Sequence, residues 1–308
     1  MVIEHIVISG GGPTGLLSYG ALKYLEQTQF WNIENIKSIY GTSIGSLIAT
    51  IISLKHDWKT IDDYLIKCPW DKILPVDTTI DNLFNAYENK GIIPHSIVEI
   101  FMKPLLLSKD LSVDITLEDY YKFNNIEIHF MSVELNDFTI ENISYITYPK
   151  LKLVDALKMS CVLPIMFTPF MINDKCYIDG GLLLNYPLDL CIQDQECDPD
   201  NVMGLKNIWE GQNEKITHAS NLFNYIKLIL RKIGTKMDKE NNKIKIKNEI
   251  NCINELKEYV DWLGVLNNED CRSFLIERGM TYGEIFITYI TKLKNNNSNS
   301  NNINSNNE

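Results

Sequence analysis

The chain has 308 residues, 45% of them hydrophobic and 22% charged, which allows a large buried core and excludes a disordered or fibrous protein. Twenty-nine basic residues against 40 acidic ones give a net charge of −11, and we expect no nucleic-acid partner because phosphate backbones repel such a chain. The seven cysteines form no C-x-x-C pair. We therefore expect neither a zinc site nor a disulfide framework.

The sequence shows no segment that would insert into a membrane. Charge interrupts the N-terminus too early for a signal peptide. The longest weakly charged stretch, Ser38–Leu54, is too short for a span and contains two glycines. Scattered thiols suit a reducing compartment, so we expect a cytoplasmic protein that meets membranes only peripherally.

The first 55 residues alternate between strand and helix patterns. Apolar runs at Ile3–Ser9 and Ile36–Tyr40 predict buried strands, and each is followed by glycines and a helical pattern, at Gly15–Gln27 and Gly45–Leu54. This order is typical of an α/β sheet with right-handed crossovers. The mixed, proline-containing segment Trp58–Leu111 predicts helices and loops that cover the sheet or the site.

Further strand and helix patterns complete the expected fold. They predict a hairpin of Ile126–Leu135 with Phe138–Thr147, a helix over Leu153–Ser160, and strands at Lys175–Ile178 and Asn201–Lys206. We therefore expect a three-layer α/β sandwich with a mainly parallel central sheet and a helical C-terminal elaboration.

The C-terminal third differs in character. Apolar residues recur at three and four positions from Ile216 to Ile233, which predicts an amphipathic helix, and a lysine-rich loop and two more helices follow. The basic segment Lys227–Lys247 suits anionic lipid head groups, and the alternative is a solvated loop beside a helix that packs on the core. We expect one domain over residues 1–290, with its motifs in 3–205 and the helical part in 206–290. The Asn/Ser-rich residues 295–308 predict a disordered tail.

The first motif is the glycine run Gly10-Gly11-Gly12-Pro13-Thr14-Gly15, between a strand and a helix. Its backbone amides and the helix N-terminus suit an anion, either a phosphate or the oxyanion of acyl transfer. The run also fits G-x-G-x-x-G, but no acidic residue ends the second strand as a dinucleotide site requires. A plain strand-to-helix turn is the remaining alternative.

Two further motifs supply a nucleophile and a base. Ser43 lies in Gly41-Thr42-Ser43-Ile44-Gly45, a G-x-S-x-G with a strand before it and a helix after it, which predicts a nucleophile elbow. Asp179 begins Asp179-Gly180-Gly181 at the end of an apolar strand. A serine hydroxyl needs a base to accept its proton, and an aspartate within hydrogen-bond reach can do so.

The ordered set of three motifs resembles the patatin-like phospholipases, as do the runs Ser160–Phe167 and Tyr177–Pro187. The resemblance covers roughly residues 3–205. It implies a lipid acyl hydrolase of the phospholipase A type with a Ser43–Asp179 dyad, no metal and no cofactor. It also implies an acyl-lipid or phospholipid substrate. It assigns the oxyanion loop to Gly10, Gly11 and Gly12, with the amides of Gly11 and Gly12 on the oxyanion, and a supporting role to Gly15, Gly41, Gly45, Gly180 and Gly181.

One departure from the family pattern leaves alternatives open. Thr14 stands where the family usually has lysine or arginine, which allows a degenerate protein that binds lipid without turnover. An acyltransferase or thioesterase acting on acyl carriers is the other alternative, and it would pair Ser43 with a histidine. None of the five histidines lies in a motif. We therefore interpret them as structural or solvated.

Overall fold

A computed structural model describes residues 2–70, 87–209, 215–220, 222–254, 264–265 and 267–304. Its main sheet is built from β1 (His5–Ile8), β2 (Ser38–Thr42), β4 (Glu127–Glu134), β5 (Thr139–Ile143), β7 (Phe170–Ile172), β8 (Lys175–Asp179), β9 (Val202–Trp209) and β10 (Glu249–Asn254). The strand order is β10-β9-β1-β2-β4-β8-β7, with β5 also paired to β4. A small parallel pair joins β3 (Gly91–Ile93) to β6 (Ile165–Phe167).

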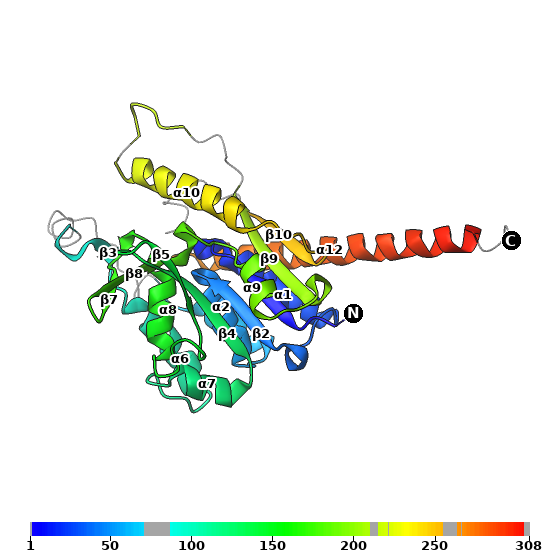
Figure 1. Cartoon of the computed structure of the whole chain (residues 1–308), viewed down its shortest axis with the longest axis horizontal. Coiled ribbons are helices and arrows are strands. Elements are labelled where there is room, and N and C mark those ends of the chain that lie inside the picture. Colours follow the sequence, from blue (N-terminus) through cyan, green and yellow to red (C-terminus); the bar gives the residue numbers. More distant parts are fainter. Residues whose placement is uncertain are drawn as a thin grey trace.

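Helices lie on both sides of this sheet (Figure 1). They are α1 (Gly15–Gln27), α2 (Ile44–Ser53), α3 (Trp58–Lys67), α6 (Ile97–Leu107), α7 (Leu117–Asn124), α8 (Leu153–Cys161), α9 (Leu188–Asp194), α10 (Leu222–Asn241) and α12 (Glu269–Asn304). Short 3-10 turns precede α1 at Gly12–Thr14 and follow β8 at Gly180–Leu182. Among the described residues, no helix combines the length and apolarity needed to cross a bilayer.

The central strands are buried on both faces because they are parallel and covered by helices. β10, β9, β1, β2 and β4 run parallel, and the antiparallel strands gather at the β8 end. Successive side chains of a strand point to opposite faces. Ile6 and Ile8 accordingly join the large core with α1 and α2, whereas Val7 and Tyr40 join a second cluster beside α9. The structure therefore confirms the three-layer α/β fold.

The elements before residue 210 follow the sequence closely. α1 has the predicted bounds, and the predicted hairpin is confirmed as the antiparallel pair β4–β5. β9 extends the strand expected over Asn201–Lys206 as far as Trp209. Residues 71–86, inside the segment predicted as helices and loops, lie outside the described residues.

The C-terminal part differs from expectation in three ways. α10 begins at Leu222, so the predicted start at Ile216 is wrong. The expectation of helices alone after the lysine-rich loop is wrong at β10, which pairs with β9 at the edge of the sheet. α12 continues to Asn304 into the stretch expected to be disordered, because extending a helix that is already formed avoids the cost of nucleation.

Candidate active site

Ser43 occupies a strained backbone turn between β2 and α2. Its backbone angles φ and ψ are 56° and −126°. Residues other than glycine rarely adopt these values, which are typical of a nucleophile elbow. A Cβ on Gly45 would collide with the carbonyl oxygen of Ile8, and a Cβ on Gly41 would lie 2.7 Å from the oxygen of Gly45. Both motif glycines therefore allow the strand–helix contact that holds the elbow.

Ser160, near the end of α8, forms a hydrogen bond with the backbone of the elbow. The Ser43 N–H donates to the Ser160 hydroxyl oxygen at 3.1 Å, while the Ser160 hydroxyl donates to the carbonyl oxygen of Met131 at 2.7 Å. The hydroxyl of Ser46 lies 2.8 Å from Ser160 and must be the donor there, because the Ser160 proton is already engaged. The Ser43 amide is thus occupied and cannot hold an oxyanion.

Strand pairing brings Asp179 to the elbow. Thr42, the last residue of β2, pairs with Met131 of β4, and Asp179, the last residue of β8, pairs with Ser132. β5 pairs with the opposite edge of β4. β2 and β8 therefore share one edge of β4, where their last residues lie at neighbouring positions. Ser43 follows Thr42 directly, so its side chain lies beside Asp179, where it lowers the pKa of that carboxyl.

Asp179 carries a buried carboxyl whose pKa is raised. Its side chain is 4% exposed, and Oδ1 accepts the Gly181 N–H at 2.8 Å. Burial raises the pKa of Asp179 to about 6, and the hydrogen bonds from Ser43 and Gly181 oppose this shift. A Cβ on Gly180 would collide with the carbonyl oxygen of Met131, so glycine is needed for the turn to approach β4. A base with a pKa near neutrality suits proton transfer at physiological pH.

The glycine run lies directly beside Ser43. A Cβ on Gly10 would lie 3.3 Å from the Cβ of Ser43. The Gly10 N–H donates to the carbonyl oxygen of Asn185 at 3.1 Å, so this amide of the loop is engaged within the fold. Within the described part of the chain, the amides of Gly11 and Gly12 donate no hydrogen bond.

Thr14 fixes the peptide that carries the Gly12 amide. The Thr14 side chain is fully buried, and its hydroxyl donates to the Gly11 carbonyl oxygen at 2.7 Å. In a trans peptide the C=O and the following N–H point in opposite directions, so anchoring the Gly11 carbonyl also orients the Gly12 N–H. Gly15 lets α1 pack on the elbow, because a Cβ there would collide with the side chain of Ile44.

Two asparagines act on the preceding peptide in the same way. Asn207 Nδ2 and Asn185 Nδ2 each lie 3.4 Å from the Gly10 carbonyl oxygen, whose peptide carries the Gly11 N–H. Asn207 is 6% exposed and also accepts from the Ser18 hydroxyl at 3.3 Å. No sequence motif assigns a site role to Asn185, Asn207 or Ser160. A single polar residue near a strand or helix end carries no signal until the fold places it.

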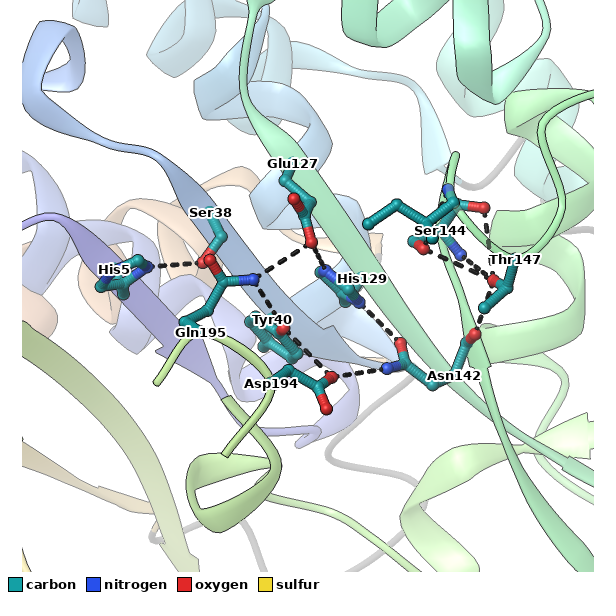
Figure 2. Close-up of polar contacts among 11 residues, drawn as sticks. His5, Ser38, Tyr40, Glu127, His129, Asn142, Ser144, Thr147, Asp194 and Gln195 are labelled. Carbon is teal, nitrogen blue, oxygen red and sulfur yellow. Dashed lines mark hydrogen bonds and ion pairs between the residues drawn. The ribbon is translucent and has the colours of Figure 1, made fainter. Parts of the chain in front are cut away.

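Both ring nitrogens of His129 have hydrogen-bond partners (Figure 2). Its Nδ1 lies 2.7 Å from Asn142 Oδ1, its Nε2 lies 2.6 Å from Glu127 Oε1, and its ring stacks on Tyr40 at 4.0 Å. With both ring nitrogens engaged, His129 is unavailable as a base for Ser43. The network continues from Asn142 of β5 to Asp194 of α9, because Asn142 Nδ2 donates to Asp194 Oδ2 at 2.9 Å.

The other histidines have partners elsewhere or face solvent. His5 contacts Ser38, His56 contacts Leu105 and Ser108, His95 contacts Thr168, and His218 is exposed. Across the described residues, no histidine bonds to Ser43, and no three His, Cys, Asp or Glu side chains gather as a metal site. Asp179 is therefore the base candidate that the geometry provides.

Comparison with known proteins gives several distant relatives. The chain is 26% identical over 192 residues to a probable lipid hydrolase of Invertebrate iridescent virus 6, covering 62% of this chain and 63% of that protein. It is 25% identical over 232 residues to an uncharacterized protein of Acanthamoeba polyphaga mimivirus, covering 73% of each chain. The first match thus spans less than two thirds of the viral hydrolase.

Solved structures and a family profile extend the comparison. VipD from Legionella pneumophila aligns with a TM-score of 0.48 and 16% identity, covering 90% of this chain and 67% of VipD. ExoU in its complex with SpcU from Pseudomonas aeruginosa aligns with a TM-score of 0.47 and 14% identity, covering 93% and 52%. The profile of the patatin-like phospholipases matches residues 6–192, which include the glycine run, the elbow and Asp179. The chain belongs to the patatin-like phospholipase family.

Proposed function

We propose that this protein hydrolyses fatty acyl esters of lipids through an acyl-enzyme, with Ser43 as the nucleophile and Asp179 as the base. The observation that carries the proposal is the position of Ser43, on a strained elbow at the end of β2, next to the buried Asp179 at the end of β8. Membership of the family supports a lipid substrate, in particular a phospholipid cleaved in the manner of a phospholipase A.

The reaction balances with these two side chains and water. The Ser43 oxygen bonds to the ester carbonyl carbon as its proton passes to Asp179, and the oxyanion lies between the Gly11 and Gly12 amides. The Asp179 proton then goes to the leaving alcohol, and the acyl group stays on Ser43. Water, deprotonated by Asp179, attacks the acyl carbonyl carbon. The bond to the Ser43 oxygen then breaks, the proton on Asp179 passes to that oxygen, and the fatty acid leaves with both side chains restored.

Thr14 favours turnover over a degenerate lipid-binding role. The departure from the family's basic residue removes a positive charge near the loop. The buried Thr14 hydroxyl, however, anchors the Gly11 carbonyl, so the loop keeps a fixed shape. Backbone amides supply most of an oxyanion hole, and a preorganised loop retains that contribution.

The test is fatty acid release from mixed phospholipid vesicles in the presence of a chelator. We expect release by the wild-type protein and at least a thousandfold less by Ser43→Ala and by Asp179→Asn. Equal release by the wild type and Ser43→Ala would refute hydrolysis at Ser43. Activity that survives Asp179→Asn would point instead to the acyltransferase class with another base.

A further inference from the structure

One face of α10 carries an exposed apolar stripe. Leu222, Tyr225, Ile229 and Ile233 recur at spacings of three and four, and they are 72%, 49%, 39% and 39% exposed. Spacings of three and four place side chains on one face of a helix. Figure 1 places α10 along the outside of the molecule, away from the centre of the sheet. Burying such a stripe is favourable, so this face suits a partner.

The charge on α10 is opposite to that of the whole protein. The helix contains five basic residues against two acidic ones, in a chain of net charge −11. Lys232, Lys236 and Lys239 are exposed on the same outer side as the stripe. The loop after the helix adds three more basic residues, which are Lys243, Lys245 and Lys247. An apolar stripe bordered by lysines is typical of helices that lie in the interface of an anionic membrane.

The opposite face of α10 packs on the turn that carries the catalytic base. A Cβ on Gly234 would lie 2.7 Å from the carbonyl oxygen of Gly181. Asn241 Nδ2 donates to the carbonyl oxygen of Leu183 at 2.9 Å, and Met237 packs against the apolar cluster of that turn. The helix thus touches the segment after Asp179 with one face and presents the stripe with the other.

We infer that α10 is the membrane-docking element of this protein, and that it seats the Asp179 turn against an anionic lipid surface. The inference rests on the proposed function, because it names the surface from which the substrate reaches Ser43. Docking buries the apolar stripe at the head-group boundary while the lysines contact anionic lipids. The catalytic turn then lies one helix diameter from the membrane.

An anionic bilayer fits this face better than a second copy of the chain does. Two copies that met through α10 would bring two positive helices together, which repel. A bilayer offers negative charge and an apolar interior along the whole length of a 20-residue helix. Within the protein Lys236 lies 4.0 Å from Glu240 and Lys247 lies 2.7 Å from Asp200, and an anionic surface would contact the exposed lysines of the helix while it covers the stripe.

Vesicle binding by the full-length Ser43→Ala protein tests the inference without consuming the lipid. Vesicles of phosphatidylcholine alone are compared with vesicles containing about a third phosphatidylserine, by sedimentation at several salt concentrations. We expect binding to the anionic vesicles that weakens with salt. Adding Lys232→Glu, Lys236→Glu and Lys239→Glu lowers the affinity about a hundredfold, and Ile229→Ser with Ile233→Ser lowers it about tenfold.

A matched triple charge reversal controls for net charge. Lys59→Glu, Lys103→Glu and Lys122→Glu change exposed lysines on α3, α6 and α7, and we expect less than about a threefold effect. An equal loss of binding in both triple variants, both folded by circular dichroism, would overturn the inference. So would unchanged binding in the α10 variants. A dimer that dissociates in Ile229→Ser with Ile233→Ser would assign the stripe to a second copy. Because Ser43→Ala is used throughout, binding is read independently of hydrolysis.

Discussion

The Thr14 hydroxyl donates a hydrogen bond to the Gly11 carbonyl oxygen at 2.7 Å, inside the loop beside the nucleophile. This bond fixes the peptide plane that carries the Gly12 N–H. Because the Ser43 amide is bonded to Ser160 and the Gly10 amide to Asn185, Gly11 and Gly12 are the glycine amides left for an oxyanion. Thr14, which departs from the family pattern, therefore orients one of the two amides that we propose to hold the oxyanion.

Removing the Thr14 hydroxyl tests this role. We expect Thr14→Val, which has nearly the same shape, to lower kcat about ten- to hundredfold with little change in KM, because the loop contacts only the developing oxyanion. Thr14→Ser retains the hydroxyl and should keep most of the activity. Steady-state kinetics on a soluble ester measure both variants. Wild-type kcat in Thr14→Val would assign the loop geometry to Asn185 and Asn207 alone.

The pKa of Asp179 predicts how the rate depends on pH. Burial raises this pKa to about 6, and Asp179 must be ionised to accept the Ser43 proton. We expect kcat/KM to rise tenfold per pH unit below about 6 and to level off above it. A pH–rate profile on a soluble ester from pH 4.5 to 8 measures the midpoint. A midpoint near 4, the ordinary range of an aspartate, would contradict the buried-base account.

The same shift predicts that Asp179 costs stability at neutral pH. The folded pKa of about 6 lies above the ordinary value of 3.8, so the folded state holds its proton more tightly than the unfolded state. Stability that is fully present below about 3.8 is therefore lost as the pH rises through 6. We expect Asp179→Asn to be more stable than the wild type at pH 8, by up to about 3 kcal/mol.

Denaturant unfolding of both proteins at pH 5 and pH 8 checks this stability prediction. The advantage of Asp179→Asn should widen toward pH 8, because the wild-type carboxyl is increasingly ionised there. Asparagine can still accept the Gly181 N–H through its side-chain oxygen, so that hydrogen bond is preserved. An advantage that is the same at both pH values would show that burial does not shift the titration of Asp179.

The contact between α10 and the Asp179 turn gives a further prediction. Gly234→Ala normally stabilises a helix by about 1 kcal/mol, but its Cβ would lie 2.7 Å from the Gly181 carbonyl oxygen. We expect this variant to displace the turn, lower kcat and shift the midpoint of the pH–rate profile. Gly264→Ala is the matched control, because a Cβ at Gly264 has no atom within 4 Å. Identical profiles for the two variants would exclude the coupling.

The sequence predicts the N-terminal half of this fold well for a local reason. The buried parallel strands β1 and β2 are apolar runs, and glycines mark the turns after β2 and β8, at which Ser43 and Asp179 lie. Three of the six residues of the edge strand β10 are polar, so Glu249–Asn254 is not a continuous apolar run like the central strands. Its pairing with β9 is formed across about 40 residues of sequence, which no local pattern reveals.

Only part of the site can be predicted from the sequence, because some of its contacts join residues that are distant along the chain. Motifs point to the proposed nucleophile, the proposed base and the glycine run, because each needs particular residue types at fixed spacing. Asn207, Asn185 and Ser160 act through hydrogen bonds to backbone groups distant in sequence, so folding alone shows their roles. The engaged amide of Gly10 is likewise visible only in the fold.

Covalent labelling tests directly whether Ser43 is a nucleophile that Asp179 activates. The purified protein is treated with a fluorophosphonate, and the modified peptide is mapped by mass spectrometry. We expect stoichiometric modification of Ser43, none in Ser43→Ala, and at least hundredfold slower labelling in Asp179→Asn. Labelling of another residue, or an equal rate in Asp179→Asn, would contradict a nucleophile at Ser43 that is activated by Asp179.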